Sequence, residues 1–392
     1  MSGKGEVVGY EFHVGLHSLQ RGGAAPKLAA AAGYVAALMM AVRMCAQSGR
    51  VGFAELPLVA LNALDEVGTV PQGTLLALQF DAPVADPDAV GTQLRRWRAA
   101  GARIGWRSDA LHGLPESEKP DFLLVVQGGR VLTEVLKEIR ERKIMQAALP
   151  ILAFDLDGID ALESALQAGA DYACCVLAAR SDPAGAGQIA PQSQRVLQLL
   201  NSIVRDAPTD ELVAAIKADV GLSYRLLRYL NSAGVGRRQE IGSIQQAVVA
   251  LGRDELYRWL SVLLVRVSSG RPISVALQEM ALARARFLEL LAEAAREPKP
   301  GELFTLGTTS MLGQLLSSPL ARVVESLALP ESTRLALLEG AGTRSVYLEL
   351  AEAVSEPDSE RFQRLACEFG GRERVLAMSA EAWQFAANPE HA

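Results

Sequence analysis

A stretch rich in proline, glycine and alanine at residues 181–191 interrupts the chain and separates two parts with different hydrophobic periods. A segment of this composition, without apolar periodicity, is typical of a linker between domains. Before it, short apolar runs alternate with helical segments, whereas helical periods follow it. We therefore expect two domains, at residues 1–180 and 192–392, joined by this linker.

The first part of the chain predicts repeated β–α units. Several of the expected strands are apolar on both faces, as parallel strands covered by helices are. The expected strands are 7–14, 51–55, 75–80, 103–106, 122–126, 151–154 and 172–177. Asp86 followed by Pro87 predicts the start of a helix, and Gly101 and Gly169 stand where helices would end. The pattern favours an α/β fold and a (β/α)8 barrel over an open sheet. Because such a barrel usually needs roughly 200 residues or more, we expect a trimmed one.

The second part predicts an all-helical domain, and its clearest signal lies at residues 219–252. Leu222, Leu226 and Leu230 recur at spacings that share one face of a helix. Arg225 falls on or near the other side of that helix. Further amphipathic stretches, separated by proline or glycine, predict helices at 321–329, 331–338, 346–354 and 360–369.

A second helix of this signal is expected after a gap that contains glycine. Ser243 and Gln246 form a capping box, in which the serine hydroxyl and the glutamine amide satisfy the first free N–H groups of a helix. Gly252 suits the left-handed residue just past a helix end, so it predicts where this helix stops. Asn231 is expected to cap the helix before the gap.

The composition argues against several other classes of protein. Hydrophobic residues make up 49% of the chain and charged residues 21%, which is enough apolar surface for folded cores. A net charge of −6 argues against a dedicated nucleic-acid binder, which usually carries a basic domain. The start lacks the apolar core of a signal peptide, and the four cysteines lack the spacing of a zinc site or a disulfide framework. We therefore expect a cytoplasmic protein.

The stretch at 219–252 resembles the HDOD domain, an all-helical relative of the HD metal-dependent phosphohydrolases. The matching pieces are Leu222-Ser223, Arg225-Leu226-Leu227, Asn231-Ser232-Ala233, Ile241, Ser243-Ile244, Ala247-Val248 and Leu251-Gly252. The resemblance marks five positions as an HDOD-like motif: Arg225, Asn231, Ser232, Ser243 and Gly252.

The metal-binding residues of the HD enzymes are missing from the second part. In those enzymes a His-Asp pair helps to hold the metal. Ser310-Met311 stands where the resemblance places that pair. The only histidine after residue 112 is His391, so a histidine-based metal site in the second domain is excluded by composition.

The first part resembles the EAL domain, a cyclic di-GMP phosphodiesterase built on a (β/α)8 barrel. Val8-Gly9-Tyr10-Glu11-Phe12 is similar to the first strand of that family, in which a glutamate opens the signature. Glu11 is that glutamate. Later pieces at 101–104, 120–123 and 169–172 follow in the order of the family. The resemblance implies a degenerate EAL-like barrel followed by an HDOD-like domain.

The resemblance also shows which catalytic residues are replaced. An EAL phosphodiesterase holds two divalent cations with carboxylates at its strand ends. Arg107-Ser108 stands in place of the paired aspartates, and Leu124 in place of the catalytic lysine. Other positions of the family's site fall on or near Glu55, Leu78 or Gln79, Phe154 and Cys174-Cys175. Glu11 alone cannot hold a metal pair, and a cation at Arg107 would repel metal. We therefore expect no metal, no cofactor and no catalysis.

Two groups of arginines are candidate interaction sites. The first group comprises Arg95, Arg96, Arg98, Arg103 and Arg107. It could receive an acidic partner or a phosphate, or it could form a solvated helix face and strand. The second group, Arg237 and Arg238, lies in the gap of the HDOD-like motif, either as recognition residues or in a solvated turn.

The sequence therefore predicts a bacterial, two-domain signalling protein of the pseudoenzyme type. The resemblance implies that it acts by binding protein partners in a cyclic di-GMP-related pathway, without nucleic acid, membrane or cofactor. The alternative is a receptor that binds cyclic di-GMP or another nucleotide without hydrolysing it, which the replaced ligand residues disfavour. A third hypothesis, a hydrolase with an unrecognised site, rests only on His13, His17 and His112. The oligomeric state and the identity of the partner stay open.

Overall fold

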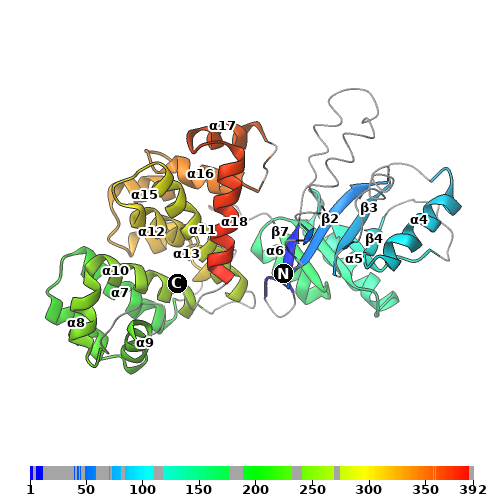
Figure 1. The fold of residues 1–392 in the computed structure, drawn as a ribbon. Helices are drawn as coiled ribbons and strands as arrows, with labels where there is room; N and C mark the ends of the chain where they lie inside the picture. The colour runs from blue at the N-terminus through cyan, green and yellow to red at the C-terminus, as the bar shows by residue number, and fades with distance from the viewer. Residues whose placement is uncertain are drawn as a thin grey trace. The chain divides into compact units, whose positions relative to one another are not determined.

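The computed structural model divides into two compact units, residues 1–176 and 177–392. The residues that it describes are 1–2, 6–11, 39, 42–43, 45, 49–58, 70, 73–80, 84–109, 118–175, 189–231, 241–268, 274–355, 357 and 359–387. All the strands of this described part belong to the first unit (Figure 1).

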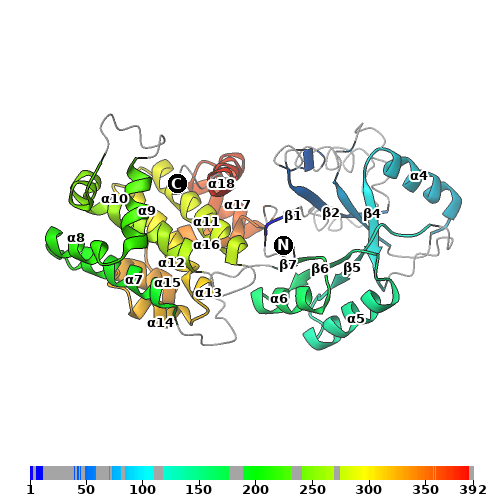
Figure 2. The ribbon, with the colours of Figure 1, turned by 90° about the horizontal axis from the view of Figure 1, so that it is seen from below.

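Parallel strands, paired in sequence order, form the sheet of the first unit. They are β1 Gly9–Glu11, β2 Val51–Pro57, β3 Leu75–Gln79, β4 Arg103–Arg107, β5 Phe122–Val126, β6 Ile151–Leu156 and β7 Tyr172–Cys175. The helices of the described part that lie outside the strands are α4 Pro87–Ala99, α5 Leu132–Met145 and α6 Ile159–Ala168 (Figure 2). The expected strands and the α/β class are confirmed for the described residues.

The sheet curls until its two edges nearly meet. Phe53 on β2 and Phe154 on β6 have ring centroids 4.2 Å apart, although β3, β4 and β5 lie between these strands in the sheet. The start of the chain bridges the remaining gap, because Ser2 pairs with Tyr172 on β7. The described part therefore forms a nearly closed barrel, as expected, with seven strands instead of the eight of a full (β/α)8 barrel.

Large apolar side chains fill the inside of the barrel. They are Phe53, Leu75, Ala77, Phe122, Leu124, Leu152 and Phe154. Gly105 on β4 makes room for Phe122, because a Cβ at that position would lie 2.5 Å from its ring. On the outside, Leu94 and Trp97 of α4 pack against the strands. The predicted start of this helix is confirmed, since the Asp86 carboxylate accepts a hydrogen bond from the Ala89 N–H at 3.1 Å.

The described part of the second unit is helical throughout. Its helices are α7 Pro191–Val204, α8 Thr209–Lys217, α9 Val220–Leu230, α10 Ile244–Val267, α11 Ser274–Ala294, α12 Pro300–Ser310, α13 Leu312–Leu315, α14 Leu320–Glu325, α15 Glu331–Leu338, α16 Ser345–Ala353, α17 Glu360–Glu368 and α18 Arg372–Ala387. Helix α11 is central, and α10, α12, α13, α16 and α18 contact it (Figure 1). The helices expected at 331–338, 346–354 and 360–369 are confirmed, whereas the one expected at 321–329 ends already at Glu325. Among the helices that the structure describes, none is long and apolar enough to cross a membrane.

Candidate functional site

An ion pair between Glu55 and Arg107 lies at the mouth of the barrel, where the parallel strands end. Glu55 lies near the end of β2 and Arg107 is the last residue of β4, with β3 between them. The Arg107 guanidinium donates from Nε to Glu55 Oε1 at 2.8 Å and from a terminal nitrogen to Oε2 at 2.9 Å. This bidentate geometry is the strong form of the pair, and it raises the pKa of Arg107. A fixed guanidinium therefore occupies this part of the mouth.

Apolar side chains occupy two of the positions that the EAL resemblance assigns to the catalytic site. Leu124 and Phe154 belong to the buried core inside the barrel, and Phe154 packs against Phe53. Leu78 is buried on the opposite face of the sheet, against α4. In the described part of the chain, no group of three or more His, Cys, Asp or Glu side chains is arranged to hold a metal ion.

Glu11 is paired with a thiol. It ends β1, and its carboxylate forms a hydrogen bond with Cys174 on β7, across the seam of the barrel. Burial and then the charge of Glu11 raise the pKa of Cys174, so the thiol stays protonated. Burial also raises the pKa of Cys175 to about 12. All four cysteines are free, and neither thiol at this seam has the low pKa of a reactive nucleophile.

The arginine group at residues 95–107 is largely matched to carboxylates of the same unit. Arg95 and Arg98 on α4 both pair with Glu118, which is buried. Arg98 also binds Asp121 at 3.0 Å. Arg107 is held by Glu55 as described above, while Arg96 and Arg103 are exposed. A role of this group in binding a partner stays a prediction.

Helix α9 carries the first half of the HDOD-like motif. Its apolar face, Leu222, Leu226 and Leu230, is buried, and Arg225 is exposed on the other side. Asp219 caps the helix, because its carboxylate accepts a hydrogen bond from the Leu222 N–H at 3.0 Å. An aspartate just before an apolar helical period is a local signal of this cap in the sequence.

Asn231 has a larger role than capping α9. Its amide nitrogen donates to the Ile241 carbonyl at 3.0 Å, and its amide oxygen accepts from the Ile241 N–H at 2.9 Å. The two bonds tie the residues on either side of the gap to each other. Ser232, Arg237 and Arg238, which the sequence also singled out, lie outside the described residues.

The second half of the motif folds as its local signals predict. The Ser243 hydroxyl accepts a hydrogen bond from the Gln246 N–H at 3.2 Å and so caps α10. Gly252 interrupts α10 with φ 74° and ψ 176°, a left-handed φ that favours glycine. The predicted helix end at Gly252 is thus confirmed as a break, after which the helix resumes.

Ser310 and Met311 are buried at the end of α12. The Ser310 hydroxyl donates to the Gly307 carbonyl at 2.7 Å, which is an ordinary role for a serine in a helix. Neither side chain is an imidazole or a carboxylate, the ligands with which an HD-type site holds its metal. The four histidines, at positions 13, 17, 112 and 391, lie outside the residues that the structure describes.

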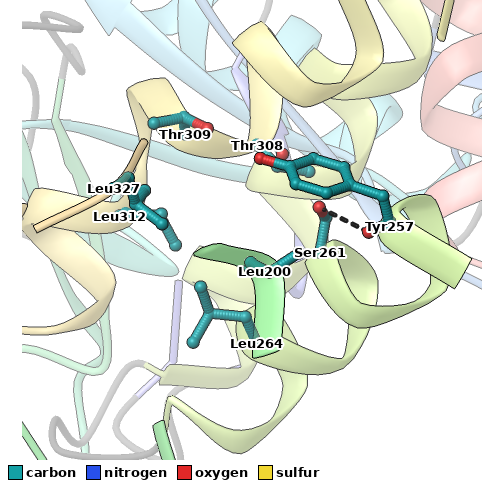
Figure 3. Close-up of a pocket in the computed structure, with 8 residues that line it drawn as sticks. All are labelled: Leu200, Tyr257, Ser261, Leu264, Thr308, Thr309, Leu312 and Leu327. Atoms are coloured by element: carbon teal, nitrogen blue, oxygen red, sulfur yellow. Dashed lines mark hydrogen bonds between the residues drawn. The ribbon is translucent and has the colours of Figure 1, made fainter. Parts of the chain in front are cut away.

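A small pocket lies between α7, α10, α12 and α13 (Figure 3). Four of its lining residues carry hydroxyl groups: Tyr257, Ser261, Thr308 and Thr309. Burial raises the pKa of Tyr257 to about 12, and Ser261 donates to the Tyr257 carbonyl at 2.9 Å. The space open to the centre of a water molecule is about 10 Å³, close to the minimum for a single water. This pocket is far too small for a nucleotide.

The comparisons with known proteins define the class of the helical unit. Residues 189–329 match the model of the HDOD domain family, so the chain contains an HDOD domain in this region. The HDOD resemblance is therefore confirmed, whereas the EAL resemblance of the barrel stays a prediction.

Two particular relatives resemble part of the chain. One is the uncharacterized protein YuxH of Bacillus subtilis, 32% identical over 168 residues, which are 42% of this chain and 40% of that protein. The other is the cyclic di-GMP phosphodiesterase CdgJ of Vibrio cholerae, 30% identical over 189 residues, which are 46% of this chain and 42% of that protein. The match spans about two fifths of the length of each relative.

Two solved structures are also similar. An HDOD domain protein of unknown function from Geobacter sulfurreducens is 15% identical, with a TM-score of 0.34, over 52% of this chain and 93% of that one. The MmoQ response regulator from Methylococcus capsulatus is 18% identical, with a TM-score of 0.25, over 48% of this chain and 96% of that one.

Proposed function

We propose that this chain is a non-catalytic signalling protein that acts in a cyclic di-GMP-related pathway by binding other proteins. The observation that carries the proposal is the ion pair at the barrel mouth. Arg107 stands where the EAL resemblance implies metal ligands, and Glu55 holds its guanidinium with two hydrogen bonds. Metal-assisted hydrolysis requires a bound cation that activates a water molecule. A guanidinium cannot coordinate and activate a water molecule as a metal ion does. Its positive charge also opposes the binding of a metal ion nearby.

The pathway is inferred from the HDOD domain together with the relative CdgJ, whose name describes a cyclic di-GMP phosphodiesterase. The activity in that name is a property of CdgJ. In this chain Leu124 and Phe154 take up the inside of the barrel, where the EAL resemblance places catalytic residues. The similarity to CdgJ therefore supports a role in signalling. The residues inside the barrel favour a protein without catalytic activity.

Action through protein partners is inferred from the helical unit. The pocket in Figure 3 holds at most a water molecule, so this pocket does not bind a larger ligand. Helix α9, within the HDOD domain, exposes Val220 and Tyr224, whose exposed fractions are 82% and 64%. Large apolar side chains of this kind, together with the exposed Arg225, are typical of interaction surfaces.

The proposal is tested first by an assay for hydrolysis. We expect no turnover of cyclic di-GMP by the purified full-length chain in the presence of Mg²⁺ or Mn²⁺. The Glu11→Ala variant is the matched control, because Glu11 is what remains of the EAL signature. Turnover by the wild-type chain that disappears in Glu11→Ala would show an enzyme and refute the proposal.

A calorimetric titration with cyclic di-GMP, with and without Mg²⁺, separates the proposal from its alternative. We expect no heat of binding, because the ligand residues implied by the resemblance are replaced. Binding at micromolar affinity or tighter would instead identify a nucleotide receptor that does not hydrolyse its ligand.

A further inference from the structure

Three arginines lie on the central helix α11 of the second unit or on α10, which contacts it. Arg258 is on α10, and Arg284 and Arg286 are on α11. Each of these side chains is partly shielded from solvent. Shielding makes an arginine costly unless a carboxylate or another acceptor neutralises it. The partners of the three arginines therefore show which of these charges are neutralised by carboxylates of the same unit.

The fold satisfies Arg258. Both of its terminal nitrogens donate to the carboxylate of Glu289, whose side chain is only 5% exposed. The same guanidinium lies over the ring of Phe304, 4.2 Å from its centroid, in a cation–π contact.

The fold also satisfies Arg286. It binds Glu289 at 2.7 Å, Glu293 at 3.1 Å and Glu381 at 3.1 Å. Three carboxylates thus surround this guanidinium, and together they raise its pKa against the opposing effect of burial.

Arg284 differs from both neighbours. Within the described residues, its one hydrogen bond goes to the Ser310 hydroxyl at 3.5 Å, which is at the limit for such a bond. No carboxylate of the described part forms an ion pair with it. Glu352 contributes only a longer-range attraction, and its carboxylate is paired with Arg361 at 3.2 Å. Burial therefore lowers the pKa of Arg284, yet an arginine stays charged at neutral pH.

We propose that Arg284 is the central residue of an oxyanion site, which takes the phosphate or carboxylate group of a ligand. A guanidinium presents five N–H donors in a planar fork that matches two oxygens of such a group. One weak bond to Ser310 leaves most of these donors available. The residue is partly exposed, and its nitrogens that make no hydrogen bond are not among the fully buried atoms of the described part, so a small anion can approach them. This inference goes beyond the proposed function and does not depend on it.

The test is thermal unfolding of the full-length chain in rising concentrations of inorganic phosphate, with sodium chloride adjusted to keep the ionic strength constant. A ligand that binds the folded state raises Tm in proportion to the logarithm of its concentration above Kd. We expect this rise for the wild-type chain and its loss in Arg284→Met. Arg205→Met removes an exposed arginine from the same unit and should respond as the wild type does.

A parallel series with acetate distinguishes the two sources of the oxyanion. A rise in Tm with phosphate alone points to a phosphorylated ligand, and a rise with acetate alone points to a carboxylate. The inference is overturned if neither anion raises the Tm of the wild-type chain, or if Arg284→Met responds as strongly as the wild type.

The change in stability caused by Arg284→Met has an expected direction even without an added anion. Arg284→Met should be at least as stable as the wild type, because it removes a charge that the fold does not satisfy. If this variant does not fold, Arg284→Lys decides the matter. Lysine keeps the charge but lacks the planar fork, so a weaker response to the anion supports the site, and an unchanged response overturns it.

Discussion

The two units pair arginine with glutamate under opposite conditions of solvent access. At the barrel mouth, the side chains of Glu55 and Arg107 are 24% and 40% exposed. In the helical unit, Glu289 is 5% exposed and lies between Arg258 and Arg286. Water and salt weaken the attraction between Glu55 and Arg107. The buried charge of Glu289, in contrast, is neutralised by its two arginines. The comparison indicates that the helical network is needed for stability, while the barrel pair can be changed at little cost.

The largest expected effect comes from removing the buried carboxylate. Glu289→Gln leaves the shielded guanidinium of Arg258 with a neutral partner and removes one of the three carboxylates around Arg286. We expect a loss of about 3–5 kcal/mol in the free energy of unfolding. Urea unfolding followed by far-UV circular dichroism measures it. The matched control is Glu381→Gln, because Glu381 also binds Arg286 but is 56% exposed. That control should lose no more than about 1 kcal/mol, and equal losses would remove the distinction between the two environments.

A smaller effect is expected at Asp219, which combines a helix cap with an ion pair. Its carboxylate accepts from the Leu222 N–H at 3.0 Å and from Arg195 at 2.9 Å. The backbone hydrogen bond, and then Arg195, lower the pKa of Asp219 from its ordinary value of 3.8. Asp219→Ala should cost about 1 kcal/mol at neutral pH, as the loss of a cap does.

The pH dependence of this loss follows from the direction of the pKa shift. Because the pKa is lower in the folded state, the contribution of the carboxylate is fully present above pH 3.8 and fades as the pH falls through the folded-state pKa. The difference in stability between the wild type and Asp219→Ala should therefore shrink below pH 3.8. Asp219→Asn keeps a good cap without a titrating group, so it should stay close to the wild type at neutral pH. A loss in Asp219→Ala that is independent of pH would contradict the assignment.

The elements of the fold were predictable because their signals are local. Asp86, Ser243 and Gly252 each act on backbone groups within a few residues, so their roles can be read from short stretches. The alternation of apolar runs likewise identified the strands, and their number indicated a barrel. Closure of the barrel was harder to predict from the sequence, because the pairing of Ser2 with Tyr172 joins residues at opposite ends of the first unit.

The partners within the candidate sites were not predictable, since they join residues that are distant in the chain. Glu55 and Arg107 could each be placed at a strand end, but their bidentate pairing depends on how far the sheet curls. Spacing gave no sign that Asn231 binds the backbone of Ile241 across the gap. That Arg284 forms no ion pair within the described residues is still harder to predict, because it depends on which carboxylates pair with the neighbouring arginines.

The smallest expected effect is the loss of the ion pair at the barrel mouth. Arg107→Met should lower the free energy of unfolding by less than about 1 kcal/mol, because a pair with this much solvent access contributes little. A double-mutant cycle with Glu55→Gln measures the coupling between the two side chains directly. The corresponding cycle of Arg258→Met with Glu289→Gln should give the larger coupling.

If the proposed function is right, Arg107→Met should show no turnover of cyclic di-GMP, because Leu124 and Phe154 still occupy the inside of the barrel. The hydrolysis assay with Mn²⁺ checks this on the same preparation that is used for unfolding. If removing Arg107 costs as much stability as removing Glu289, the guanidinium is a structural part of the barrel. If the variant instead gains turnover, the barrel has kept a catalytic arrangement that Arg107 blocks.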